Sequence, residues 1–265
     1  MTAPTPARQQ DILQPITDPS VHDAVDRLAR QYQRAGGVGM EFLNMVGGSA
    51  ESALRRLPDV VTRRLDRVVM RGLENAFDAA GRSRVMLLDR GDWFNRLVTS
   101  ASGAAGGLAG LPGALVELPL TITLLLRSML EIAEEHGLDP ESDEVRRECL
   151  RIFAAGGPMA QDDGVDTGLL AARLTITGQT IQGLIARVAP RLSATLAQKL
   201  AAQAAPLFGA VAGASINFTF ASYYQQLARV HFGLMRLSQE TGLTRESLTE
   251  ALELRLNQIN GPRRG

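Results

Sequence analysis

The chain has 265 residues, which is enough for one large helical domain or two small ones. Its 28 basic and 28 acidic side chains give a formal net charge of zero. This balance argues against a general nucleic-acid binder, which carries a strong basic excess, so we expect no nucleic-acid partner.

Apolar residues recur with helical periodicity almost everywhere, and strand signals are nearly absent. We predict an all-α fold, a single multi-helix bundle with long central helices rich in glycine and alanine. Residues 1–19 are expected to form a flexible leader that lacks the features of a signal peptide, residues 20–258 the helical domain and residues 259–265 a disordered tail. The expected helices cover 20–33, 40–57, 58–80, a segment from 92, 114–136, 142–155, 167–188, 191–204, 207–238 and 244–258.

The helix expected over residues 58–80 has a basic face. Its apolar residues share one side, and Arg63, Arg64, Arg67 and Arg71 lie largely opposite. A basic amphipathic helix can lie on an anionic membrane surface. The alternative is a helix that covers the core of the bundle with its arginines in solvent, and acidic residues of the same helix dilute its positive field.

Residues 97–116 and 200–228 contain no charged residue. Each segment reaches the length of a membrane span, which needs about 20 mostly apolar residues. The first segment is mainly small residues and the second contains amides, so both are less hydrophobic than a usual span. We interpret them as buried core helices of a soluble or peripheral protein, with insertion into a bilayer in some states as the alternative.

Three polar stripes repeat at helical spacing, so the members of each stripe share one helix face. They are Glu117, Thr121 and Ser128, then Arg173, Thr177 and Thr180, and then Asn217, Tyr224 and His231. If the stripes converge, they line an internal cavity for a ligand. The alternative is a set of buried hydrogen-bond networks that only support the fold. Glu117 is also suited to a helix N-terminus, where a carboxylate is favoured.

Recognisable catalytic motifs are missing from the sequence: it has no GxSxG, HExxH, P-loop or dinucleotide-binding pattern. The three histidines are scattered, and Cys149 falls in an amphipathic segment, which favours a core thiol. Lys199 is the only lysine, which we attribute to composition bias. We therefore assign no catalytic residue, no metal ligand and no cofactor, and we favour a non-enzymatic protein.

The stretch GGLAGLPGALVELPLTITLLLRSMLEIAEEHGLDPESDEVRRECLRIFAAGG, residues 106–157, resembles the EcsC protein family. The closing segment GAVAGASINFTFASYYQQLARVHFGLMRL, residues 209–237, is similar to the last helix of that family. The likeness extends over about residues 30–245. The resemblance implies a bacterial, cytosol-facing protein associated with membrane processes, and an ABC transporter is one partner that it suggests. It provides no catalytic residues to carry over.

Three functions are compatible with these patterns. The first is a peripheral protein at the inner face of the membrane that binds lipid or another apolar ligand. The second is an accessory or scaffold subunit of a transporter or other membrane protein. The third is an unrecognised hydrolase that acts on lipid through the polar stripes, which requires those stripes to meet in space.

Overall fold

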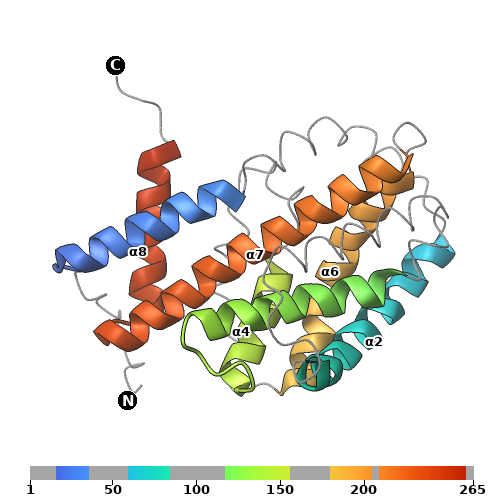
Figure 1. Ribbon diagram of the computed structural model, residues 1–265, viewed down its shortest axis with the longest axis horizontal. Coiled ribbons are helices and arrows are strands. Elements are labelled where there is room, and N and C mark those ends of the chain that lie inside the picture. Colours follow the sequence, from blue (N-terminus) through green and yellow to red (C-terminus); the bar gives the residue numbers. More distant parts are fainter. Residues whose placement is uncertain (1–15, 36–58, 84–116, 156–179, 205–208, 261–265) are drawn as a thin grey trace, which may run out of the picture.

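The computed structural model describes residues 16–35, 59–83, 117–155, 180–204 and 209–260 (Figure 1). These residues form 7 helices and no strand, so the predicted all-α fold is confirmed for this part of the chain. The helices are 19–35, α2 (Asp59–Ser83), 117–135, α4 (Asp143–Ala154), α6 (Ile181–Ala204), α7 (Gly209–Thr241) and α8 (Arg245–Asn260). Several predicted segments lie wholly or largely outside the described residues: the leader, the tail, and the helices at 40–57 and from 92.

The ends of the helices follow signals that are visible in the sequence. Ser142 caps α4, and its Oγ accepts a hydrogen bond from the amide of Val145 at 3.3 Å. Gly137, the predicted stop of the preceding helix, has a φ of 72°, a left-handed conformation that glycine adopts at little cost. Thr244 caps α8, and its Oγ1 accepts from the amide of Ser247 at 3.2 Å.

The helix boundary predicted between residues 188 and 191 is wrong, because α6 runs without interruption through Pro190. Proline lacks an amide donor and clashes with the preceding turn, which normally ends a helix. In α6 the apolar side chains on both sides of Pro190, including Val188 and Leu192, are buried, and the helix packs against α2 and α4. This tertiary packing outweighs the local cost of the proline. Residues 167–179 of the predicted helix lie outside the described residues.

The helix α7 is the longest described element, with 33 residues, and spans about 50 Å at the usual helical rise. It contacts α4, α6 and α8. Figure 1 shows helix 19–35 and α8 near the C-terminal end of α7, and α2 and α6 toward its N-terminal end. Buried apolar side chains from the first helix through α8 belong to one core cluster.

Two pairs of helices approach closely at a glycine. A Cβ at Gly72 of α2 would lie 2.9 Å from Cδ1 of Ile122, and a Cβ at Gly233 of α7 would lie 2.6 Å from Cδ2 of Leu28. Any larger residue therefore requires Ile122 or Leu28 to move. These contacts set α2 against helix 117–135, and helix 19–35 against α7.

Candidate functional site

The first candidate site is a buried polar cluster that joins three helices. Glu117 and Thr121 lie on helix 117–135, Lys199 on α6 and Asn217 on α7, and all four side chains are buried. Glu117 Oε1 accepts hydrogen bonds from Asn217 Nδ2 at 2.7 Å and from Thr121 Oγ1 at 3.2 Å, and it lies 3.5 Å from Lys199 Nζ. We call these four residues the Glu117 cluster. It brings together an acid, a base and an amide that are distant in sequence.

Lys199 is the unusual member of this cluster, because only 1% of its side chain is exposed. Burial lowers the pKa of its ammonium group, and the negative charge of Glu117 opposes this shift without cancelling it. An ammonium group has three N–H donors. Among the described residues Lys199 has a single polar contact, at 3.5 Å, the outer limit of a hydrogen bond. Within the described part of the chain, Lys199 therefore has N–H donors without a hydrogen-bond acceptor.

A second buried cluster lies where α4, α7 and α8 meet. Glu148 of α4 and His231 of α7 are fully buried, and His231 Nδ1 lies 2.6 Å from Glu148 Oε1. Arg245 of α8 donates to both carboxylate oxygens, at 2.8 and 3.1 Å. Arg151 donates to Glu148 Oε2 at 2.6 Å. We call these four residues the Glu148 cluster, and it fastens the start of α8 to the core.

The positive charge of Arg245, with the hydrogen bonds of this cluster, holds Glu148 in its ionised form. Burial by itself raises the pKa of this carboxyl group, but the positive charge of Arg245 and the hydrogen bond from His231 outweigh burial, and the pKa lies well below its usual value. A carboxylate only accepts hydrogen bonds, so Nδ1 of His231 carries a proton. His231 Nε2 is buried and has no hydrogen-bond partner among the described residues.

A carboxylate that orients an imidazole also occurs in catalytic and metal sites. Within the described ranges, however, no group of three or more His, Cys, Asp or Glu side chains is placed to hold a metal ion. The neighbouring Cys149 is fully buried, which confirms the predicted core thiol. Burial, and then the charge of Glu148, raises the pKa of this thiol, so little nucleophilic thiolate forms.

The predicted polar stripes meet only in part. Asn217 contacts Glu117, so the stripes of helix 117–135 and α7 do come together at one point. His231, in the same stripe as Asn217, instead contacts Glu148. Tyr224 lies between them on α7 and packs edge-on against Phe153, with ring centroids 5.5 Å apart. The middle residue of this stripe is thus part of an aromatic contact, and an internal ligand cavity lined by the stripes remains a prediction.

The remaining stripe residues have local roles or fall outside the described chain. Ser128 is buried and donates to the backbone carbonyl of Leu125 at 2.9 Å. Thr180 is exposed, and its Oγ1 accepts from the backbone amide three residues later at 3.1 Å, which caps α6. Arg173 and Thr177 lie outside the described residues.

The helix α2 has the amphipathic character that its sequence predicts. Arg67 and Arg71 are exposed, and Met70 between them is exposed as well. Two acidic residues of the same helix are also exposed, so its described side chains carry no excess of positive charge. The side chains of Arg63 and Arg64 are not among those described.

Two large apolar side chains are exposed beside the Glu117 cluster. Leu120 lies three residues after Glu117, and Phe218 directly follows Asn217; each is 49% exposed. The hydrogen bond between Asn217 and Glu117 brings these two helical turns together. Leu120 and Phe218 therefore lie at the same end of the bundle.

The two charge-free segments adjoin this cluster along the sequence. Residues 97–116 end directly before Glu117, and residues 200–228 directly follow Lys199 and include Asn217. The first segment lies outside the described residues. None of the described helices has both the length and the apolar character needed to cross a bilayer.

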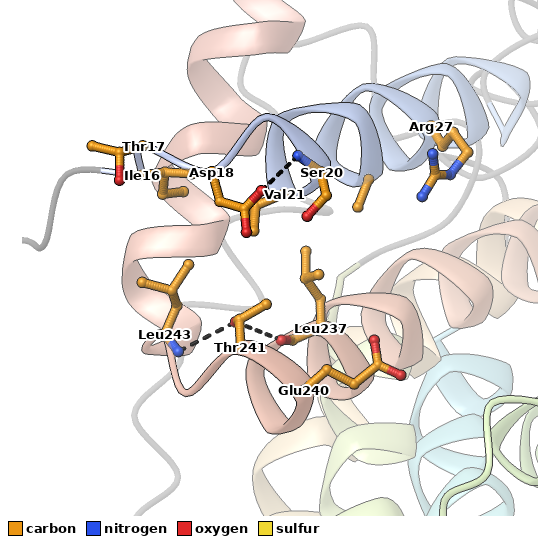
Figure 2. A pocket seen from close by; sticks show the side chains of 11 residues that line it. Ile16, Thr17, Asp18, Ser20, Val21, Arg27, Leu237, Glu240, Thr241 and Leu243 are labelled. Atoms are coloured by element: carbon orange, nitrogen blue, oxygen red, sulfur yellow. Dashed lines mark hydrogen bonds between the residues drawn. The ribbon is translucent and has the colours of Figure 1, made fainter.

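A surface pocket of ≈ 680 Å³ lies between the start of helix 19–35 and the turn that joins α7 to α8 (Figure 2). Asp18, Glu240 and Arg27 supply its charges, and all three are exposed. Asp18 accepts a hydrogen bond from the amide of Ser20 at 2.8 Å, so this carboxylate is already used to cap a helix. No residue predicted from the sequence lines this pocket, and we regard it as secondary to the buried clusters.

Sequence reasoning missed the charged partners in both clusters, although two of them left a signal. The chain has 28 basic residues, and Lys199 is its only lysine. Its place within an apolar helix distinguishes this position from the arginines. Glu148 lies on the same face of α4 as the buried residues Val145 and Ile152, so its position places an acid toward the core. Arg245 left no signal, because only tertiary packing brings it to Glu148.

The fold and the two clusters define an all-α bundle protein with charged side chains enclosed in its core. Residues 82–237, more than half of the chain, match the EcsC protein family. The chain therefore belongs to this family, as its sequence resemblance predicted. Neither a curated protein nor a solved structure matches the chain.

Proposed function

We propose that this EcsC-family protein is a non-enzymatic, membrane-associated protein that binds lipid or another apolar ligand. Its expected location is the inner face of the cytoplasmic membrane, where it acts as a peripheral protein. The observation that supports this proposal best is the pair of exposed apolar side chains, Leu120 and Phe218, at the end of the bundle that contains the Glu117 cluster. Exposed apolar side chains gathered at one end of a protein are typical of a surface that meets lipid or an apolar partner.

The position of α2 adds an electrostatic argument. The contact between Gly72 and Ile122 sets α2 against the helix that carries Leu120. Arg67 and Arg71 are exposed on α2, and arginines near a membrane attract anionic lipid head groups. The two arginines provide local basic groups beside the apolar residues, although Asp66 and Glu74 of the same helix balance their charge.

The test is flotation of the purified full-length protein with liposomes made of phosphatidylcholine and phosphatidylglycerol. We expect the wild-type protein to float and the variant Leu120→Gln/Phe218→Gln to remain in solution. A matched control is Leu254→Gln, because Leu254 is 58% exposed but lies on α8. The control should float like the wild-type protein.

A second pair of substitutions tests the electrostatic contribution of α2 to membrane binding. Arg67→Ser/Arg71→Ser should weaken flotation at low salt, and added salt should weaken flotation of the wild-type protein, because exposed charges are screened. If the wild-type protein does not float at any salt concentration, the proposal fails. Recovery with native membranes but not with pure lipid would instead support an accessory subunit of a membrane protein.

A further inference from the structure

We infer that Lys199 binds the head group of an anionic lipid, with the acyl chains lying on Leu120 and Phe218. This inference rests on the proposed membrane association and names the class of lipid. The shared chemistry is a phosphate or carboxylate oxygen that accepts hydrogen bonds from the Lys199 ammonium group.

The first argument is the incomplete set of partners around Lys199. A buried ammonium group is costly unless its donors are satisfied and its charge is balanced. Lys199 Nζ lies 3.5 Å from Glu117 Oε1, and the described residues provide no second polar contact for it. The oxygens of an anionic head group would occupy the donors that remain.

The second argument is that the Glu117 carboxylate has hydrogen-bond donors other than Lys199. Its Oε1 accepts from Asn217 Nδ2 at 2.7 Å and from Thr121 Oγ1 at 3.2 Å, and both contacts are shorter than the one to Lys199. The carboxylate therefore keeps two partners if the ammonium group turns toward a ligand. Glu117 also repels an incoming anion, so it competes with the ligand and sets its affinity.

The third argument is that two exposed apolar side chains lie on the helical turns that carry Glu117 and Asn217. Leu120 and Phe218 belong to the same helical turns as Glu117 and Asn217, and both are half-exposed. A lipid that enters with its head group first would leave its chains on these two side chains and in the bilayer. This orientation suits a protein that stays at the membrane surface.

The experiment compares liposomes of phosphatidylcholine alone with liposomes that also contain phosphatidylglycerol, at about 0.5 M salt, where exposed charges are largely screened. We expect the wild-type protein to bind the anionic liposomes about tenfold more tightly, the size expected from one charge-assisted hydrogen bond. Lys199→Met/Glu117→Gln should lose this preference and still bind through its apolar side chains. It removes both charges together and leaves no buried charge unpaired.

Two further variants sharpen the result. Glu117→Gln removes the competing carboxylate and should strengthen the preference for anionic liposomes, which a purely structural ion pair would not do. Arg67→Ser/Arg71→Ser should leave the preference at high salt unchanged. Circular dichroism establishes that each variant is folded.

The outcomes separate this inference from the proposed function. If the protein binds both kinds of liposome but the double variant keeps the salt-resistant preference, the assignment of Lys199 is wrong and membrane association stands. If inorganic phosphate alone stabilises the wild-type protein and abolishes the preference, the site recognises a free anion and the lipid assignment fails. If the wild-type protein binds no liposome, both proposals fail.

Discussion

Arg245 in the first turn of α8 donates two hydrogen bonds to Glu148 of α4, at 2.8 and 3.1 Å, across 97 residues of sequence. Glu148 lies within the segment that matches the EcsC family, whereas Arg245 lies beyond its end at residue 237. The ion pair therefore joins the C-terminal helix to the family region through a fully buried carboxylate.

Replacement of Arg245 should strongly destabilise the protein. Arg245→Met leaves Glu148 buried with fewer partners, and the loss of one member of a buried pair costs about 3 kcal/mol. A suitable control is Arg236→Met, because the pair between Arg236 and Glu240 is about half-exposed and such pairs contribute about 0–1 kcal/mol. Urea denaturation followed by circular dichroism measures both effects. Equal effects in the two variants would contradict a special role for the Glu148 cluster.

The lowered pKa of Glu148 predicts how stability depends on acid. The usual pKa of 4.5 applies to the unfolded chain, and the folded protein holds this group at a lower value. As the pH falls below 4.5, the unfolded chain binds a proton more readily, so the contribution of Glu148 is lost. The free-energy difference between the wild-type protein and Glu148→Gln should therefore be largest near neutral pH and shrink in acid. If the stability difference between the wild-type protein and Glu148→Gln did not change with pH, Glu148 would not be ionised in the folded core.

Lys199 predicts that stability also rises with pH, here on the alkaline side. Its pKa is lowered from 10.5 in the folded protein, so the unfolded chain binds more protons between the lowered value and 10.5. The stability of the wild-type protein relative to Lys199→Met/Glu117→Gln should therefore rise with pH in this window. Cys149 and Tyr224, whose pKa values are raised mainly by burial, affect both proteins alike and cancel in the comparison. A relative stability that falls with pH would show that Lys199 is held in its charged form.

The single thiol should be protected in the native protein. Cys149 is fully buried and burial raises its pKa, so a thiol reagent should react only when the core opens. The dye 5,5′-dithiobis(2-nitrobenzoic acid) should therefore react slowly with the folded protein and rapidly in denaturant. Fast labelling of the folded protein would show that α4 opens locally.

The close contact between Gly233 and Leu28 should be visible as coupling between two substitutions. Gly233→Ala places a Cβ 2.6 Å from Leu28 Cδ2, so Leu28 must move, at a cost of about 1–3 kcal/mol. Leu28→Ala alone removes apolar contact, and the double variant should lose less stability than the two single effects together. Strict additivity in urea denaturation would mean that the helices are not packed as described.

The sequence predicted the parts of this structure that local chemistry controls. Helical periodicity, the cap at Ser142 and the stop at Gly137 depend on neighbouring residues, and all three are present. Pro190 misled the prediction, because packing on both sides of the residue keeps α6 intact. A helix can continue through a proline when its apolar face is buried on both sides of that residue.

The candidate site was predictable only in part. Spacing placed Glu117 and Asn217 each on a defined helix face, but their contact depends on how helices 100 residues apart pack. The same holds for His231, which contacts Glu148 and not the predicted stripe on helix 117–135. Periodicity identifies the face of a helix, and tertiary packing selects the partner that this face meets.

The burial of Lys199 has a practical consequence for any search for binding partners. Amine-reactive cross-linkers act mainly on accessible lysine side chains, and this chain has one lysine, which is 1% exposed. Cys149 is buried too, so thiol-directed reagents meet the same obstacle. Neither the lysine nor the cysteine side chain of this protein would therefore capture a partner bound at its surface. A cysteine introduced at Leu254, a highly exposed position on α8, would give the reagent a place to react.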